Sequence, residues 1–145
     1  MHKDSRSLDH LGELAPLWAV PGIQFLSLQK GQGEEEGAHP PPGQKLCHLG
    51  SDIGDFADSA AIVAELDLLI SVDSAVVHLA GAMGKSCWVL VPAQRAFWLW
   101  GRAGDATPWY SENLRLFRQR RGEPWARVVE DVAGALARWA AAQTR

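Results

Sequence analysis

The sequence predicts an α/β fold, a Rossmann-like parallel sheet flanked by helices, and three observations support it. Apolar runs of strand length alternate with helical patterns along the chain. The connections between these segments are mostly short, which favours a single layered domain. The central apolar runs carry few polar residues, as do strands that are buried on both faces of a parallel sheet.

Composition narrows the class of protein. A chain of 145 residues is long enough to bury the core of one domain, so we expect residues 1–145 to form a single domain. A hydrophobic content of 47% excludes a disordered chain, and a net charge of −3 gives no reason to expect nucleic acid. No apolar run reaches the length of a membrane span, and the N-terminus has no signal-peptide pattern. Cys47 and Cys87 match no metal-ligand spacing, so we interpret them as reduced strand residues of a cytoplasmic protein.

The N-terminal third predicts one helix and two strands. Apolar residues from Leu8 to Trp18 have helical spacing, with Ser7 as a possible cap. Pro16 interrupts this pattern, so the helix is either kinked or continuous only from about Gly12. Strands are expected at 23–28 and 46–49. Between them, the glycines, glutamates and prolines of residues 31–44 are typical of a mobile loop, for which we expect no regular structure.

The central segment carries the strongest signals. A polar turn at 50–55 precedes a helix that we expect Asp58 or Ser59 to cap, and a strand follows at 68–72. The next helix runs from about Ser74 to Met83, with Asp73 or Ser74 as its N-cap. Gly84 sits where a residue in the left-handed conformation would end this helix, and a second buried strand is expected at 86–91.

The C-terminal third is rich in tryptophan. Five of the seven tryptophans lie beyond residue 97, three of them in a long loop before a strand at 114–119. The loop at 97–110 could stack on a nucleotide base, form a face that meets another domain, or pack on the core of its own domain, which is the interpretation we favour. Arg118, Arg120 and Arg121 are expected in a solvated turn, with contact between Arg118 and a phosphate as the alternative. A final helix is predicted from Pro124, and its apolar face contains Trp125, Val128, Val129, Val132, Leu136 and Trp139.

Polar side chains gather at the start of the helix near residue 74. Asp73, Ser74 and His78 lie where the strand at 68–72 ends. Ligands of parallel α/β sheets bind at this edge, and the free N–H groups of a helix N-terminus favour a phosphate. Each residue also has an ordinary structural interpretation. Asp73 and Ser74 could simply cap the helix, and His78 could be a hydrogen-bonded core residue.

The segment DFADSAAIVAELDLLISVDSAVVHLAGAMGKSCWVLVP, together with TPWY and LRLFRQ, resembles a known family. It is similar to the C-terminal half of the GT-B glycosyltransferases associated with bacterial tetratricopeptide repeats, and to the family 9 lipopolysaccharide heptosyltransferases. The family pattern D-[ST]-x-x-x-H-x-A-x-x-x-G is matched by Asp73, Ser74, His78, Ala80 and Gly84.

The resemblance implies a donor-binding domain for a nucleotide diphosphate sugar, and it implies a role for each site residue. Backbone N–H groups at Ser74 and Ala75 would hold the diphosphate, and Asp73 would accept hydrogen bonds from sugar hydroxyls. His78 would face the phosphate or the sugar. Gln29 and Lys30 stand at the end of an adjacent strand, from which the lysine could neutralise the leaving diphosphate. Without the resemblance, Lys30 would be interpreted as an ordinary surface lysine.

The resemblance also implies what we expect this chain to lack. The polar segment HKDSRS is similar to the residues that follow the first strand of the family's domain, so we expect that strand to be missing. The N-terminal acceptor domain of GT-B enzymes is absent too. We therefore expect a nucleotide-sugar-binding half that needs an acceptor-domain partner or a second copy for activity, with no cofactor and no metal. The alternatives are a non-catalytic remnant or self-associating module, and a sugar-nucleotide epimerase.

Overall fold

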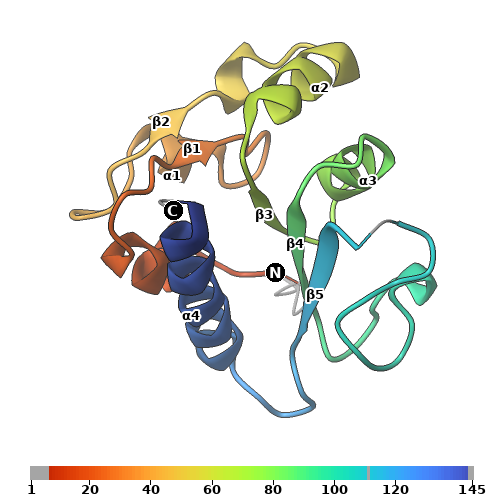
Figure 1. The fold of residues 1–145 in the computed structure, drawn as a ribbon. Coiled ribbons are helices and arrows are strands. Elements are labelled where there is room, and N and C mark those ends of the chain that lie inside the picture. The colour runs from red at the N-terminus through yellow and green to blue at the C-terminus, as the bar shows by residue number, and fades with distance from the viewer. Residues whose placement is uncertain (1–6, 111, 144–145) are drawn as a thin grey trace. The chain divides into compact units, whose positions relative to one another are not determined.

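The computed structural model describes residues 7–110 and 112–143 and has an α/β fold (Figure 1). Helices alternate along the chain with strands that form two small sheets, and the strands of both sheets pair in parallel. This confirms the predicted α/β class and the predicted parallel pairing. The chain divides into two compact units, whereas its length suggested one domain. Unit 1 is built on Asp55–Pro124, and unit 2 on Leu8–Gly54 with the C-terminal helix.

The sheet of unit 1 contains the strands β3 (Leu69–Val72), β4 (Cys87–Val91) and β5 (Leu114–Arg118), in that order. Leu69 pairs with Cys87, and Cys87 pairs with Leu114. Every residue of the central strand β4 is buried, as its uninterrupted apolar sequence predicts. All three strands lie within the predicted segments.

Helix α3 (Ala75–Ala82) connects β3 to β4 and packs on both strands. It starts after Ser74 in the N-cap position, and Gly84 has φ of +70°, as predicted for the residue that ends it. The buried residues of α3 are Val77, Ala80 and Gly81, so the helix presents mostly small side chains to its surroundings. The strand–helix–strand prediction for residues 68–91 is confirmed.

Helix α2 (Phe56–Glu65) precedes β3 and packs against α3. The prediction that Asp58 or Ser59 caps it is wrong, because the helix begins earlier and Asp55 is its N-cap. The Asp55 carboxylate accepts the N–H of Asp58 at 2.9 Å, and the Asp58 carboxylate accepts the N–H of Asp55 at 3.3 Å. This reciprocal arrangement is a capping box, in which Asp58 acts from inside the first turn.

Unit 2 holds a short sheet and the longest helix. Strands β1 (Leu26–Ser27) and β2 (Cys47–His48) pair in parallel over two residues, within the longer strands that were predicted. The 3₁₀ helix η2 (Gly50–Asp52) follows β2, in the segment predicted as a polar turn. Helix α4 (Trp125–Gln143) buries one face, confirming its predicted amphipathic pattern. The buried residues of this helix are Val128, Val129, Val132, Ala135 and Leu136.

The N-terminal helix differs from both predicted alternatives. Leu11–Ala19 form a 3₁₀ helix, η1, which contains Pro16 and packs against α4. Its N-cap is His10 and not Ser7, and the Glu13 carboxylate accepts the N–H groups of Asp9 and His10 at 2.7 and 3.1 Å. Each N–H of a 3₁₀ helix bonds to the carbonyl three residues earlier, whereas an α-helix uses the carbonyl four residues earlier. The hydrogen bond that Pro16 cannot make is therefore not the one that it would remove from the predicted α-helix.

The segment expected to be an irregular loop contains the short helix α1 (Glu34–Ala38). Three glutamates occupy its first turn, where negative charge is favourable. Glu36 accepts the N–H of Leu11 at 2.8 Å, and Glu34 accepts the N–H of Gly31 at 3.0 Å. The composition predicted a solvated connection because it does not reveal these partners. No helix within the described residues is long and apolar enough to cross a membrane.

Candidate functional site

The start of α3 is not capped by the side chain of Ser74. Ser74 occupies the N-cap position with an extended backbone, but its hydroxyl makes no bond to the helix and lies 3.1 Å from the hydroxyl of Ser71. The Ser71 hydroxyl donates its hydrogen to the carbonyl of Val72 at 2.8 Å. The Ser74 hydroxyl is therefore the donor to Ser71, because each serine has one hydrogen to give. The side chain of Ser74 therefore caps none of the first-turn N–H groups, although its carbonyl accepts the N–H of Val77 at 3.1 Å.

His78 lies one turn into α3, and both of its ring nitrogens face partners. Nδ1 is 2.8 Å from the hydroxyl of Tyr110, and Nε2 is 3.5 Å from a carboxylate oxygen of Asp73. The imidazole stacks on Trp100 at 5.2 Å between ring centroids, and Phe97 meets it edge-on at 5.8 Å. His78 is thus half-buried, with 32% of its side chain exposed. Asp73, Ser74 and His78 come together at the start of α3, as the sequence predicted.

Tyr110 is the residue of this cluster that sequence reasoning missed. It comes from the tryptophan-rich loop, and its ring lies against Gly81 of α3. Nothing local in the sequence connects it to His78, because the two residues are 32 positions apart. The motif TPWY carried part of the family resemblance, and that was the available signal.

Gln29 and Lys30 belong to unit 2, where they follow β1. The Gln29 amide donates to the carbonyl of Gln32 at 2.6 Å, and the Lys30 ammonium is 3.5 Å from the carbonyl of Gly50. A Cβ on Gly50 would lie 1.8 Å from the carbonyl oxygen of Gln29, so the chain needs glycine at that position. The candidate residues therefore divide between the units, with the four around Ser74 in unit 1.

A second polar cluster lies in unit 2, at the carboxyl ends of β1 and β2. Nδ1 of His48 is 3.1 Å from the hydroxyl of Ser27, and Nε2 is 3.9 Å from the carboxylate of Glu34. The His48 side chain is only 9% exposed, and its Nε2 has no hydrogen-bond partner in the described part of the chain. The sequence contained a signal for this pair, since Ser27 and His48 lie near the ends of two predicted parallel strands.

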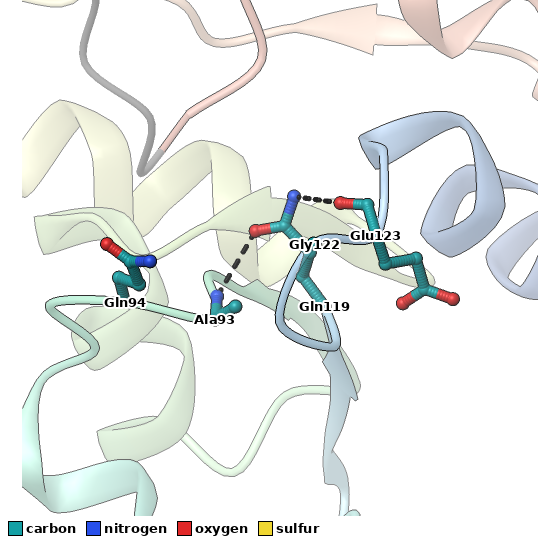
Figure 2. A pocket seen from close by; sticks show the side chains of 5 residues that line it. All are labelled: Ala93, Gln94, Gln119, Gly122 and Glu123. Atoms are coloured by element: carbon teal, nitrogen blue, oxygen red, sulfur yellow. Dashed lines mark hydrogen bonds between the residues drawn. The ribbon is translucent and has the colours of Figure 1, made fainter.

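The open hollow of Figure 2 lies beyond the carboxyl ends of β4 and β5 in unit 1 and has a volume of about 180 Å³. Ala93, Gln94, Gln119, Gly122 and Glu123 line it. The Gln119 side chain accepts the N–H of Ala93 at 3.1 Å and donates to the carbonyl of Glu123 at 2.8 Å, as Figure 2 shows. The Glu123 carboxylate accepts the N–H of Arg120 at 2.8 Å. Gln119 and Glu123 thus tie together the loops that shape the hollow.

The tryptophan-rich loop both packs and exposes its aromatic rings. Trp100, in the 3₁₀ helix η3 (Trp98–Trp100), is 1% exposed, which confirms packing for this residue. Trp98 and Trp109 are 68% and 59% exposed and meet edge-to-face at 5.7 Å. For these two, packing on the core is the wrong interpretation.

The side chain of Arg118 binds the backbone of the same tryptophan-rich loop. Its guanidinium donates to the carbonyls of Trp100, Gly101, Ala103 and Gly104, the last at 2.6 Å. Burial lowers the pKa of this arginine. The prediction that Arg118 belongs to a solvated turn is therefore wrong, because its donors are used within the loop. Among the described residues, no group of three or more His, Cys, Asp or Glu side chains is placed to hold a metal ion.

Fold and site together define an α/β protein with parallel sheets and a polar cluster where strand β3 meets helix α3. Among proteins of known sequence, the chain is similar to Protein FlbA of Caulobacter vibrioides, with 35% identity over 137 residues. The match covers 91% of this chain and 22% of FlbA, so the chain spans less than a quarter of that relative. No protein-family model matches the chain, and no solved structure matches it.

Proposed function

We propose that this chain is the nucleotide-sugar-binding half of a GT-B glycosyltransferase, similar to those associated with tetratricopeptide repeats. The observation that carries the proposal is the start of α3, where the Ser74 side chain makes no capping bond to the first helical turn at the carboxyl edge of a parallel sheet. Such N–H groups and the helix dipole favour a phosphate. The family pattern through Asp73, Ser74 and His78 supplies the ligand class.

Each residue of unit 1 then has a proposed task. The N–H groups at Ser74 and Ala75 bind the diphosphate of the donor. The Ser74 hydroxyl, which donates to Ser71 in the chain without ligand, is proposed to donate its hydrogen to the diphosphate instead, because ionised phosphate oxygens only accept. Asp73 accepts hydrogen bonds from hydroxyl groups of the sugar.

The proposed reaction is a displacement at the anomeric carbon. An acceptor hydroxyl forms the new glycosidic bond and gives up its proton to a base of the acceptor domain. The bond between the anomeric carbon and the diphosphate oxygen breaks, and the diphosphate leaves with the electron pair. Helix N–H groups stabilise the charge that develops on that oxygen. Because the chain spans 22% of FlbA, we propose transfer only for an assembly that also supplies an acceptor site.

The test is a titration with UDP, GDP, ADP and CMP while amide chemical shifts are recorded. We expect one nucleoside diphosphate to move the Ser74 and Ala75 amides at millimolar concentration. The variant Ala75→Pro removes one N–H group at the first helical position, where proline is tolerated. The extended backbone of Ser74, with φ of −154° and ψ of 166°, suits a residue that precedes proline. Ala75→Pro should weaken binding about tenfold, in the range of a hydrogen bond to a charged group.

Phe56→Pro is the matched control. Phe56 is the first residue of α2, is 64% exposed, and follows an N-cap with an equally extended backbone. This change should leave nucleotide binding unaltered. Absence of any amide response near Ser74 with all four nucleotides would overturn the proposed function.

A self-associating, non-catalytic module is the second candidate, favoured by the exposed Trp98 and Trp109. Exposed aromatic side chains of this size are enriched at protein interfaces. Sedimentation of the wild-type protein and of a Trp98→Ser, Trp109→Ser double variant separates the candidates. Concentration-dependent association that the double variant abolishes, without a nucleotide response, supports the module.

A further inference from the structure

Tyr110 makes the shortest polar contact of the cluster around His78. Its hydroxyl oxygen lies 2.8 Å from His78 Nδ1, and its ring packs on Gly81. A Cβ on Gly81 would come within 2.7 Å of the tyrosine ring, so the absence of a side chain there is what admits Tyr110. The tyrosine therefore reaches His78 through a gap in α3 made by glycine.

The other ring nitrogen determines which atom donates in this contact. A neutral imidazole carries one N–H, and the carboxylate of Asp73 can only accept. With Nε2 at 3.5 Å from that carboxylate, the hydrogen is favoured on Nε2. Nδ1 then has a lone pair, so the Tyr110 hydroxyl must donate to it. The opposite tautomer would direct a nitrogen lone pair at a carboxylate, which is repulsive.

Packing fixes the imidazole plane as well. Trp100 is 1% exposed and stacks on His78 with an angle of 20° between the rings. Phe97 meets the same ring at 86°. A rotation of the imidazole would give up both ring contacts together with the two polar ones.

We propose that Tyr110 is the positioning residue of this site: it accepts no hydrogen from His78 but donates to Nδ1, which holds Nε2–H directed at Asp73. Both ring nitrogens of His78 then have partners within the protein, so His78 orients Asp73 and does not bind the ligand itself. One oxygen of Asp73 is engaged by His78, and the other remains to receive hydroxyl groups. The role of Asp73 toward hydroxyl groups rests on the proposed function, whereas the assignment of Tyr110 and His78 as hydrogen-bond donors does not.

The test uses long-range proton–nitrogen NMR spectra of the histidine side chains, without ligand, at a pH where His78 is neutral. The signals of His78 are assigned by their loss in a His78→Gln variant. We expect Nδ1 of the wild-type protein to be unprotonated and Nε2 to carry the hydrogen. Tyr110→Phe keeps the ring and removes the hydroxyl, and should shift the tautomer ratio toward Nδ1–H about fivefold, the size of one neutral hydrogen bond. A wild-type spectrum with the hydrogen on Nδ1, or an unchanged ratio in Tyr110→Phe, would overturn the inference.

Two further variants sharpen the test. Asp73→Asn replaces an acceptor by a group that can donate, so it should move the hydrogen from Nε2 toward Nδ1. Trp98→Phe changes an exposed residue of the same loop and should leave the ratio unaltered. Nucleotide titration of the wild-type protein is read separately. A tautomer shift in Tyr110→Phe, when the wild-type protein binds no nucleotide, retains the positioning role and overturns the proposed function, and nucleotide binding by the wild-type protein without a tautomer shift does the reverse.

Discussion

Gly81 and Tyr110 are in direct contact, and a methyl group on the glycine would lie 2.7 Å from the tyrosine ring. This separation is shorter than real carbon contacts, so the ring must move if residue 81 acquires a side chain. The glycine is buried in the last turn of α3, where alanine would otherwise favour the helix. Its presence there is explained by the tyrosine and not by helix formation.

The first prediction follows from that contact. Gly81→Ala should lower the free energy of unfolding by about 1 to 2 kcal/mol, since overpacking outweighs the gain in helix propensity. Gly134→Ala in α4 is the control, because its nearest neighbour is the flexible end of Arg138 at 3.6 Å. That variant should gain up to about 1 kcal/mol. Urea unfolding measures both, and equal stabilisation of the two variants would contradict the account of Gly81.

The two cysteines should differ in reactivity. Burial raises the pKa of the Cys87 thiol to about 12, and Cys87 is fully buried in β4, whereas Cys47 is exposed. The thiolate is the reactive form, so at pH 8 an alkylating reagent should label Cys47 and leave Cys87 unmodified. Mass spectrometry of the labelled native protein checks this. Labelling of Cys87 under native conditions as fast as in denaturant would show that the β4 core is open.

Arg118 should stabilise the tryptophan-rich loop through the shape of its guanidinium. Lysine keeps the charge but cannot reach the carbonyls of Trp100, Gly101 and Gly104 together, so Arg118→Lys should cost about 2 kcal/mol. Arg127→Lys is the matched control. In the part of the chain that the structure describes, Arg127 makes an exposed pair with Glu130 at 3.7 Å, and its replacement should change stability by less than about 0.5 kcal/mol. Thermal unfolding compares the two.

Acid should release the start of α1. The N–H of Gly31, and then the hydroxyl of Ser51, lower the pKa of the Glu34 carboxyl below its usual 4.5. A lowered folded-state pKa means that the ionised carboxylate stabilises the structure above pH 4.5, and that this contribution disappears as the pH falls through the lower folded-state value. The Gly31 amide shift, recorded against pH, should therefore titrate below pH 4.5. In Glu34→Gln this titration should be absent.

Local patterns predicted most of the elements correctly because the physics behind them is local. The apolar run before Asp73, the small residues of α3 and the glycine at position 84 together predicted one strand, one helix and its end. The amphipathic pattern of α4 predicted its buried face. The cap of α2 was missed although the sequence contains it, since Asp55 and Asp58 are spaced as a capping box.

The candidate site was predicted only in part. Asp73, Ser74 and His78 could be found from the sequence, because a strand followed directly by a helix places them at one edge. The partners that give them their geometry could not. Tyr110 lies 32 residues from His78, and His48 lies 21 residues from Ser27. Contacts over such separations depend on how the chain returns upon itself, which no local pattern encodes.

The sequence by itself determined the α/β class, the parallel strands of unit 1, the end of α3 at Gly84 and the polar residues beside that helix. These follow from side-chain periodicity and from backbone preferences that act over a few residues. Only the tertiary structure decided that the Ser74 hydroxyl bonds to Ser71 and that the Arg118 guanidinium bonds to carbonyls of the tryptophan-rich loop. It also decided that His78 lies between Tyr110 and Asp73. A hydrogen-bonding side chain can satisfy itself in several ways, and the folded chain selects among them by what it brings within about 3 Å.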